Sequence, residues 1–109
     1  MSEDKITYKD IEEYDNLFSM APPILLKRFA RKNTNLVLKF QSVILSHINT
    51  LNVEQKRKLD LILNMTVDEL QGLMKEAYLK TNKKQYKILS DSKYKPFIEN
   101  NINELRKIV

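Results

Sequence analysis

The chain has 109 residues, of which 42% are hydrophobic and 30% are charged, and its formal net charge is +5. It contains no cysteine, one histidine and one glycine, which excludes disulfides, thiolate and histidine-based metal sites, and glycine-rich phosphate loops. The composition predicts one folded domain over residues 1–109 that needs no cofactor.

The charge is divided unequally along the chain. Residues 1–21 carry six acids and two bases, a net charge of −4, whereas residues 22–109 carry seventeen bases and eight acids, a net charge of +9. We therefore expect an acidic N-terminal arm or helix on a basic body, which suits an anionic partner. Lysine outnumbers arginine by 15 to 4, so the codon bias of an AT-rich genome is an alternative source of the charge. The acidic helix is either part of the core or a lid that folds over the basic surface.

Caps and breakers predict two helices in the first third of the chain. Thr7 and Asp10 suit the start of a helix that ends near residue 20, and Pro23 suits the first turn of a second helix over residues 23–32. The inward stripe of the first helix is expected to be Ile11, Tyr14 and Phe18. That of the second is expected to be Ile24, Leu25 and Phe29. The outer side of the second helix forms a secondary anion strip: Lys27, Arg28, Arg31 and Lys32.

A long apolar run predicts a central helix over residues 35–50, with a strand as the competing interpretation. Its main stripe is Leu36, Val37, Phe40, Ile44, Ile48 and Leu51. Leu38, Val43 and Leu45 make its other sides apolar, so we expect it to be mostly buried. The longest apolar stretch, residues 36–48, includes Lys39 and is too short to span a bilayer, and the N-terminus does not resemble a secretion signal. We therefore expect a cytoplasmic protein that has no membrane partner.

Capping boxes predict the helices of the second half. Asn52 with Gln55 starts a helix over residues 53–64, and Thr66 with Glu69 starts the next one. That helix either continues through residue 88 or breaks at Asn82, and residues 90–92 form a loop before a last helix. The last helix starts at Tyr94 or Pro96 and ends near Lys107. The expected fold is all-α, a compact bundle of five or six short helices.

The strongest functional candidate is a stripe of lysines and tyrosines at residues 78–95. Four of its lysines recur at i, i+3, i+4 and i+7, so one helix would place them on one face, where they could neutralise phosphates while tyrosines stack on bases. The candidate nucleic-acid-binding residues are Lys80, Lys83, Lys84, Tyr86, Lys87, Lys93, Tyr94 and Lys95. The alternative interpretation is a solvated helix face, because lysine lacks the bidentate fork with which arginine binds phosphate.

Three other features carry weaker hypotheses. Gly72 and Leu79 lie near one line of a helix and form a candidate protein-contact face, with neutral drift as the alternative. Residues 59–73 have the apolar spacing of a helix-turn-helix, but the leading residues of the second helix include Asp68 and Glu69, which would oppose phosphate. His47 has no second ligand or nucleophile near it in sequence and is interpreted as a core or edge residue, with a general base that lacks a visible partner as the alternative.

These patterns favour a binding protein over an enzyme. No motif brings an acid, a base and a nucleophile together, and the paired Glu-x-x-His elements of helical metal sites do not occur. We expect a non-enzymatic subunit or regulator that binds another protein. The alternative is a nucleic-acid-binding module that uses the stripe at residues 78–95, and the oligomeric state is left open.

Overall fold

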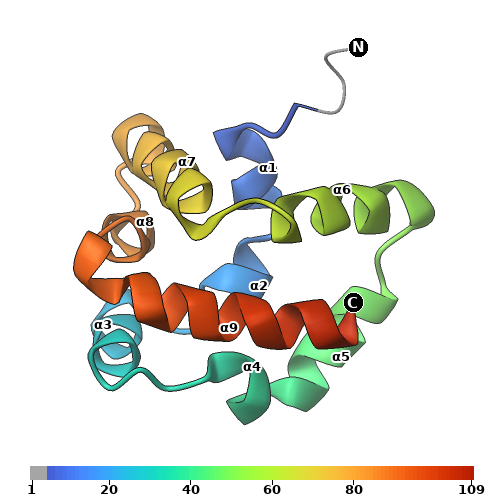
Figure 1. Cartoon of the computed structure of the whole chain (residues 1–109), viewed down its shortest axis with the longest axis horizontal. Coiled ribbons are helices and arrows are strands. Elements are labelled where there is room, and N and C mark those ends of the chain that lie inside the picture. The colour runs from blue at the N-terminus through green and yellow to red at the C-terminus, as the bar shows by residue number, and fades with distance from the viewer. Residues whose placement is uncertain (1–4) are drawn as a thin grey trace.

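The computed structural model describes residues 5–109, and all regular elements in this range are helices (Figure 1). The all-α prediction is thus confirmed. The elements are α1 (Tyr8–Glu13), α2 (Asp15–Phe18), α3 (Pro23–Arg31), α4 (Leu36–Lys39), α5 (Gln41–Asn49), α6 (Val53–Leu63), α7 (Val67–Thr81), α8 (Lys84–Leu89), the 3₁₀ turn η2 (Ser92–Tyr94) and α9 (Lys95–Ile108).

Local capping explains where several helices begin. In the capping box of α6, the Gln55 N–H donates to Asn52 Oδ1 at 2.8 Å and the Asn52 N–H donates to Gln55 Oε1 at 2.9 Å. Thr66 and Glu69 exchange the same pair of bonds at the start of α7, and α3 begins at Pro23. These bonds satisfy backbone donors that have no partner inside the helix, so the sequence specified these starts correctly.

The helices are more numerous than the five or six expected, because two expected helices are interrupted and residues 67–88 form two helices, one of the two alternatives for this segment. The backbone leaves helical geometry at Tyr14, between α1 and α2, and at Phe40, between α4 and α5. At Asn82 it turns into the left-handed region, with φ of 59°, and this ends α7. The second of the two alternatives for residues 67–88, a break at Asn82, is therefore the one that occurs.

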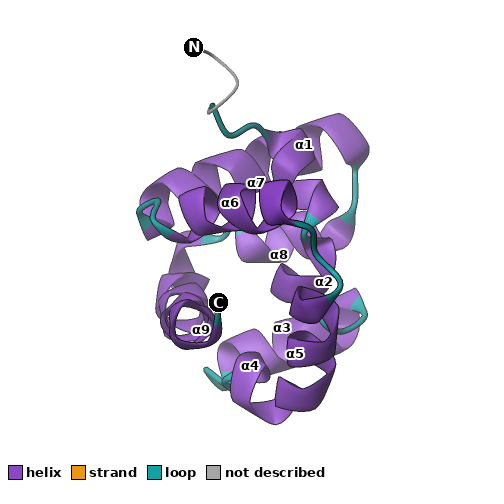
Figure 2. Ribbon diagram, turned by 90° about the vertical axis from the view of Figure 1, so that its right-hand side faces the viewer, coloured by secondary structure: helices purple, strands orange, loops and turns teal. Residues whose placement is uncertain are grey.

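The helices enclose the core from several directions. In Figure 1, α6 and α7 cross the upper half, α9 runs below them, and α3 lies beside α8 at the left edge; Figure 2 shows α4 and α5 at the end opposite α1 and α6. Packing is closest between α7 and α8 and between α1 and α7. The radius of gyration is 13.0 Å, close to the ~13 Å expected for a compact chain of about 100 residues.

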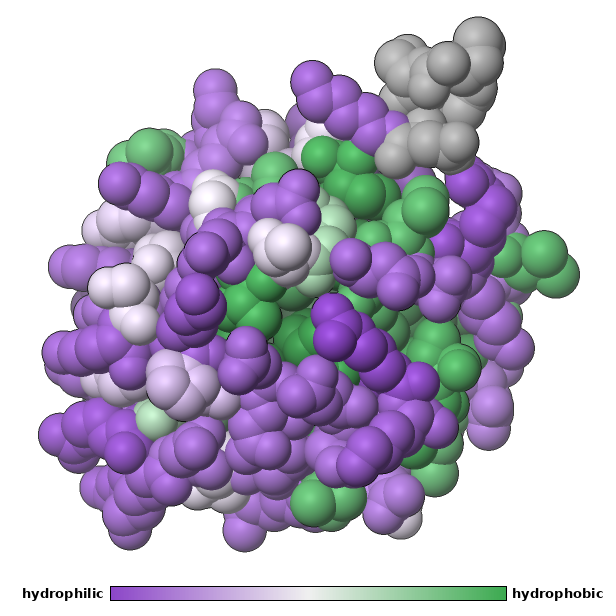
Figure 3. All heavy atoms as spheres, viewed as in Figure 1, coloured by the Kyte–Doolittle hydropathy of each residue, from purple (hydrophilic) through white to green (hydrophobic). Residues whose placement is uncertain are grey.

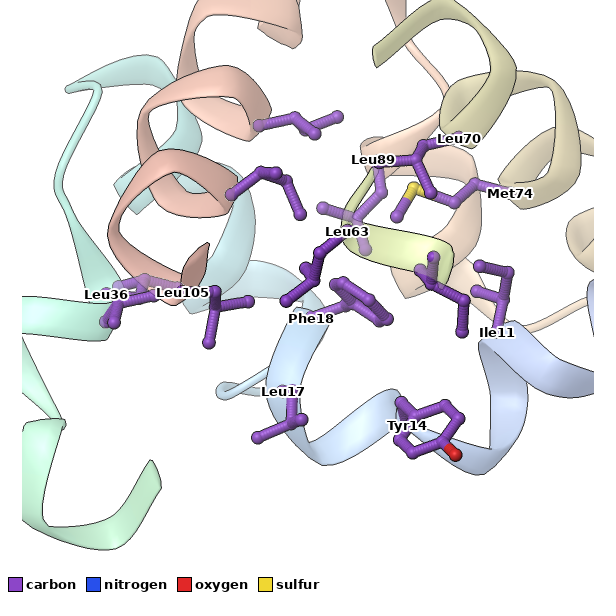
Figure 4. Packing of buried hydrophobic residues seen from close by; sticks show 14 of the residues in the cluster. Ile11, Tyr14, Leu17, Phe18, Leu36, Leu63, Leu70, Met74, Leu89 and Leu105 are labelled. Carbon is purple, nitrogen blue, oxygen red and sulfur yellow. The ribbon is translucent and has the colours of Figure 1, made fainter. Parts of the chain in front are cut away.

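The core is built from side chains of almost every helix. Figure 4 shows how residues from α1, α2, α4, α6, α7, α8 and α9 converge. Those that it labels are Ile11, Tyr14, Leu17, Phe18, Leu36, Leu63, Leu70, Met74, Leu89 and Leu105. The inward stripe expected for the first helix is confirmed, since Ile11, Tyr14 and Phe18 are all buried. The acidic first helix is therefore anchored in the core through its apolar face.

Two expectations about burial are wrong. The segment 35–50 is not a buried central helix, because Leu38 and Val43 are 56% and 61% exposed on α4 and α5 at the edge of the bundle. On α3 the buried face is Leu26 and Ala30, whereas Ile24 is 80% exposed. The apolar face expected for this helix is thus rotated toward solvent. Its basic residues are also exposed.

Side-chain amides of α9 hold the start of α4 in place. Asn101 Oδ1 accepts hydrogen bonds from the N–H groups of Leu36 at 2.8 Å and Val37 at 3.3 Å, and its Nδ2 donates to the Phe97 carbonyl at 2.8 Å. Asn35 Nδ2 donates to the Asn100 carbonyl at 3.1 Å. These bonds satisfy unpaired donors at a helix N-terminus and fix the connection between α3 and α4.

Ion pairs join the acidic helix α1 to the basic body. Lys58 Nζ lies 3.0 Å from Asp10 Oδ1, and Lys83 Nζ lies 3.4 Å from Glu12 Oε2. Burial favours the protonated form of Asp10, but the Thr7 N–H and the Lys58 ammonium outweigh it, so the pKa of Asp10 is lowered. The acidic helix is thus fixed by apolar burial and by specific cations.

The outer surface is mostly hydrophilic on the face of Figure 3, where apolar atoms show in a hollow between α9 and the α6–α7 connection. Thr66, Val67 and Ile102 contribute to the lining of this hollow, and the Asp68–Lys95 ion pair, at 3.0 Å, lies at its edge. Within residues 5–109, no helix combines the length and the hydropathy that a membrane crossing would require.

Candidate functional site

A groove between α3 and α8 brings basic and apolar side chains together. Its volume is about 380 Å³, within the range of roughly 300–1,000 Å³ that is usual for ligand pockets. The lining residues come from α3, the end of α7, α8 and η2, and they are Pro23, Ile24, Lys27, Tyr78, Lys84, Lys87, Ile88, Asp91, Lys93 and Tyr94. By contrast, the space enclosed in the core measures about 20 Å³, enough for little more than one water molecule.

Helical spacing places the groove residues of α8 on one side. Lys84, Lys87 and Ile88 lie at i, i+3 and i+4, so they share a face, while Tyr86 and Leu89 point into the core. Ile24 and Lys27 are likewise three residues apart on α3, on a side of the helix next to the buried Leu26 and Ala30. The two short helices each present an outer edge that combines an aliphatic side chain with lysine.

A buried glutamine holds the end of α8 beside the groove. Gln71 of α7 is 8% exposed, and its Nε2 donates hydrogen bonds to the carbonyls of Leu89 at 3.1 Å and Asp91 at 2.9 Å. The Asp91 carboxylate accepts a hydrogen bond from the Lys93 N–H at 3.0 Å and thereby caps η2. The wall of the groove from α8 to η2 is therefore fixed from behind by α7.

The groove carries an excess of positive charge. Four lysines and one aspartate line it, and Lys27, Lys84 and Lys87 form no ion pair within residues 5–109. Lys93 Nζ lies 3.8 Å from Asp91 Oδ2, a long contact between two largely exposed groups, which contributes little. The groove thus offers three unpaired ammonium groups to a ligand.

Two of the ammonium groups lie over aromatic rings. Lys87 Nζ is 6.0 Å from the ring centroid of Tyr78, and Lys93 Nζ is 5.3 Å from that of Tyr94. Both distances are within the range of a cation–π contact, which is worth about 0.5–1 kcal/mol at an exposed site. The tyrosines therefore form apolar walls that also orient the lysines.

The structure gathers only part of the predicted stripe into this groove. Lys84, Lys87, Lys93 and Tyr94 line it, and they are joined by Lys27 from the secondary anion strip. The stripe at residues 78–95 and the secondary anion strip, which are separate in the sequence, thus contribute to one site. Sequence reasoning missed the apolar partners Pro23, Ile24 and Ile88 and the single acid, Asp91. The i, i+3, i+4 spacing of Lys84, Lys87 and Ile88 could have indicated that Ile88 lies on the same helix face as the two lysines.

The other members of the stripe lie elsewhere. Tyr86 is fully buried, so its ring is not available for stacking on a base. Its pKa is raised far above the usual value, mainly by burial and to a smaller extent by the nearby Asp15 carboxylate. Lys83 pairs with Glu12 of α1, and Lys95 pairs with Asp68 at the start of α7. Lys80 is exposed on α7 but does not line the groove.

The remaining candidates do not join the groove. Arg28 and Arg31 of α3, and Lys32 directly after it, complete the secondary strip; they are exposed and lie outside the lining. The candidate contact face of α7 is open to solvent, because Leu79 is 69% exposed and a Cβ added to Gly72 would meet no atom within 4 Å. The remaining part of the secondary anion strip and the candidate protein-contact face therefore stay predictions.

Neither the helix-turn-helix nor His47 forms a recognisable site. The first turn of α7 carries Asp68 and Glu69, and Glu69 is engaged in the capping box with Thr66, so this N-terminus is unsuited to a phosphate. His47 is half-buried beside the exposed Val43, and its imidazole forms no hydrogen bond within residues 5–109. In the same range, no group of three or more acidic or histidine side chains is placed to hold a metal ion.

The sequence and the fold were also compared with known proteins. No protein-family model matched the chain, and no curated protein and no solved structure matched it.

Proposed function

We propose that the protein is a non-enzymatic binding module that recognises a segment of a partner protein in the groove between α3 and α8. The observation that carries this proposal is the presence of unpaired lysines and an exposed isoleucine in one groove. Ile24 is 80% exposed, so it contributes little to the core, and together with Ile88 and Tyr78 it gives the groove a contiguous apolar surface beside the lysines, as an interaction site combines an apolar centre with a polar rim.

A partner protein fits this lining better than a nucleic acid does. Of the tyrosines in the predicted stripe, Tyr86 is fully buried and Tyr94 is 5% exposed, so Tyr78, which is half-buried, is the one that offers its ring in the groove, whereas single-strand binding uses a series of stacking rings. Phosphates gain nothing from Ile24, whereas a partner's apolar side chain can bury it. The nucleic-acid-binding module is the second candidate, and the unpaired lysines are the observation that favours it.

The lining also supports a binding role over catalysis. Residues 5–109 contribute no histidine or cysteine and one carboxylate to it, and that carboxylate caps η2, so these residues place no acid, base and nucleophile together there. The cytoplasmic location expected from the sequence belongs to the same proposal, and fractionation of cells that express the tagged chain tests it.

Selection from a random peptide library displayed on phage tests the proposal. Enriched peptides should bind the wild type and lose about tenfold or more in affinity on Ile24→Ser, because burial of an isoleucine is worth about 1.5–3 kcal/mol. Val53→Ser is the matched control, since Val53 of α6 is 86% exposed and does not line the groove. Circular dichroism verifies that both variants fold.

Nucleic-acid binding is measured in parallel with labelled single- and double-stranded DNA and with RNA. Salt is varied from about 50 to 300 mM, because phosphate contacts give a steep dependence on salt. Micromolar binding that is lost in Lys84→Glu, with no peptide selected by the groove, would replace the proposed function by the second candidate. Peptides that depend on Ile24, with weak binding of nucleic acid, would support it.

A further inference from the structure

The unpaired lysines determine the charge of a suitable occupant of the groove. Lys27 approaches from α3, and Lys84 and Lys87 approach from α8, so a ligand placed between the two helices meets cations on both sides. Asp91, the one carboxylate that residues 5–109 contribute to the lining, is already engaged with the backbone and side chain of Lys93. An anionic occupant gains from these charges without displacing an existing ion pair.

The kind of anion follows from the cations that are present. No arginine lines the groove, and the three arginine and lysine side chains that complete the secondary strip lie outside it. The planar fork of arginine is what favours bidentate phosphate binding, whereas an ammonium pairs as a point charge with any exposed anion. Separate carboxylates, each opposite one lysine, fit this arrangement.

The apolar part of the lining adds a second requirement. Ile24, Ile88 and the ring of Tyr78 provide aliphatic and aromatic surface between the ammonium groups. A purely acidic chain would leave this surface in water, whereas a bulky apolar side chain next to the carboxylates would cover it.

The size of the groove limits the segment. The six residues of α8 span about 9 Å at 1.5 Å per residue. About three extended residues, at roughly 3.3 Å each, cover that length. The recognised element is therefore short.

We propose that the groove binds a short acidic segment of a partner protein, with aspartate or glutamate side chains on Lys27, Lys84 and Lys87 and a bulky apolar side chain against Ile24 and Ile88. This inference rests on the proposed function and adds the chemistry of the partner. It excludes neutral segments and purely acidic ones.

Three fluorescent peptides of about ten residues test the inference by anisotropy with the full chain. The parent peptide has leucine and phenylalanine flanked by glutamates; in the second peptide glutamine replaces glutamate, and in the third serine replaces the two apolar residues. The parent should bind with a micromolar Kd, and each altered peptide should bind at least about tenfold more weakly, a loss of about 1.4 kcal/mol. Raising the salt should weaken the parent and leave the second peptide almost unchanged.

Charge reversal locates the contact. The double variant Lys84→Glu/Lys87→Glu should bind the parent peptide at least about tenfold more weakly, and it should bind a lysine-for-glutamate version of the peptide better than the wild type does. The double variant Lys56→Glu/Lys75→Glu is the control, because it changes the net charge by the same amount and both lysines are exposed and do not line the groove. Equal loss in the control would show a response to net charge alone and would overturn the inference.

The outcomes separate this inference from the proposed function. If library-selected peptides bind through Ile24 but are neutral, or if the serine peptide binds as well as the parent, the acidic and apolar segment is overturned while protein binding stands. If no peptide binds through the groove and nucleic acid binds through Lys84, both proposals fail. Loss of the parent peptide in both Ile24→Ser and the double lysine variant, with both controls unchanged, supports the inference.

Discussion

Replacing Gln71 with methionine tests whether α7 holds the groove wall in place. Gln71 Nε2 provides the hydrogen bond that the Leu89 carbonyl receives at the end of α8, and a second one to Asp91. Methionine has a similar volume, so the change removes both bonds with little change in packing. Each lost bond costs about 0.5–1.5 kcal/mol, so the free energy of unfolding should fall by about 1–3 kcal/mol.

Thermal and denaturant unfolding followed by circular dichroism measure this loss. For a domain of this size the melting temperature should fall by about 4–12 °C. Gln41→Met is the control, because Gln41 is exposed on α5 and its side chain forms no hydrogen bond within residues 5–109; its effect should stay within about 0.5 kcal/mol. If the two variants melt at the same temperature, the carbonyls at the end of α8 do not depend on Gln71 and the reasoning is refuted.

Three further changes test other parts of the fold by unfolding measurements. Gly72→Ala should stabilise the protein by about 0.5–1 kcal/mol, because the added methyl group meets no neighbour and alanine favours the helix; destabilisation would contradict this. Asn82→Ala should destabilise it by roughly 1 kcal/mol and Asn82→Gly should not, because φ is 59° at this position; equal effects would refute the backbone argument. Asp10→Asn should cost about 1–2 kcal/mol at pH 7, because the carboxylate accepts from Thr7 and pairs with Lys58. Since the pKa of Asp10 is lowered in the folded state, this difference should be full above about pH 5 and vanish as the pH falls through that pKa; a difference constant down to about pH 2 would rule out the ion pair as its cause.

The sequence predicted what local chemistry determines. Capping boxes at Asn52 and Thr66 placed two helix starts, and the left-handed preference of asparagine allowed the break at Asn82. The breaks at Tyr14 and Phe40 carry no proline or glycine; Asp15 and Asn16 follow Tyr14 as cap-type residues, but the apolar period of Ile11, Tyr14 and Phe18 continues across them and predicts one helix. The breaks emerge only when the segments pack on the rest of the bundle.

The candidate site was harder to predict than the helices because it is tertiary. Lys27 and Lys84 are more than fifty residues apart, and they share a groove only because α3 packs on α8. The burial of Tyr86 was accessible from the spacing of Tyr86 and Leu89, which share a face opposite Lys84 and Lys87. The exposure of Ile24 could not be predicted from the sequence, because α3 carries apolar residues on more than one side and only the packing decides which side faces the core.

The division of charge along the chain acquires a physical meaning in the fold. Asp10 and Glu12 of α1 neutralise Lys58 and Lys83, which lie on the side of the molecule that α1 covers. The lysines between α3 and α8 receive no such carboxylates from within residues 5–109. The acidic helix therefore lowers the positive charge at one part of the basic body and leaves Lys27, Lys84 and Lys87 unpaired in the groove, beside Ile24 and Ile88. Exposed lysines without an ion pair also lie near exposed apolar residues elsewhere within residues 5–109, as Lys56 does near Val53 and Lys80 near Leu79. What distinguishes the groove is that two helices contribute lysines and isoleucines to one recess.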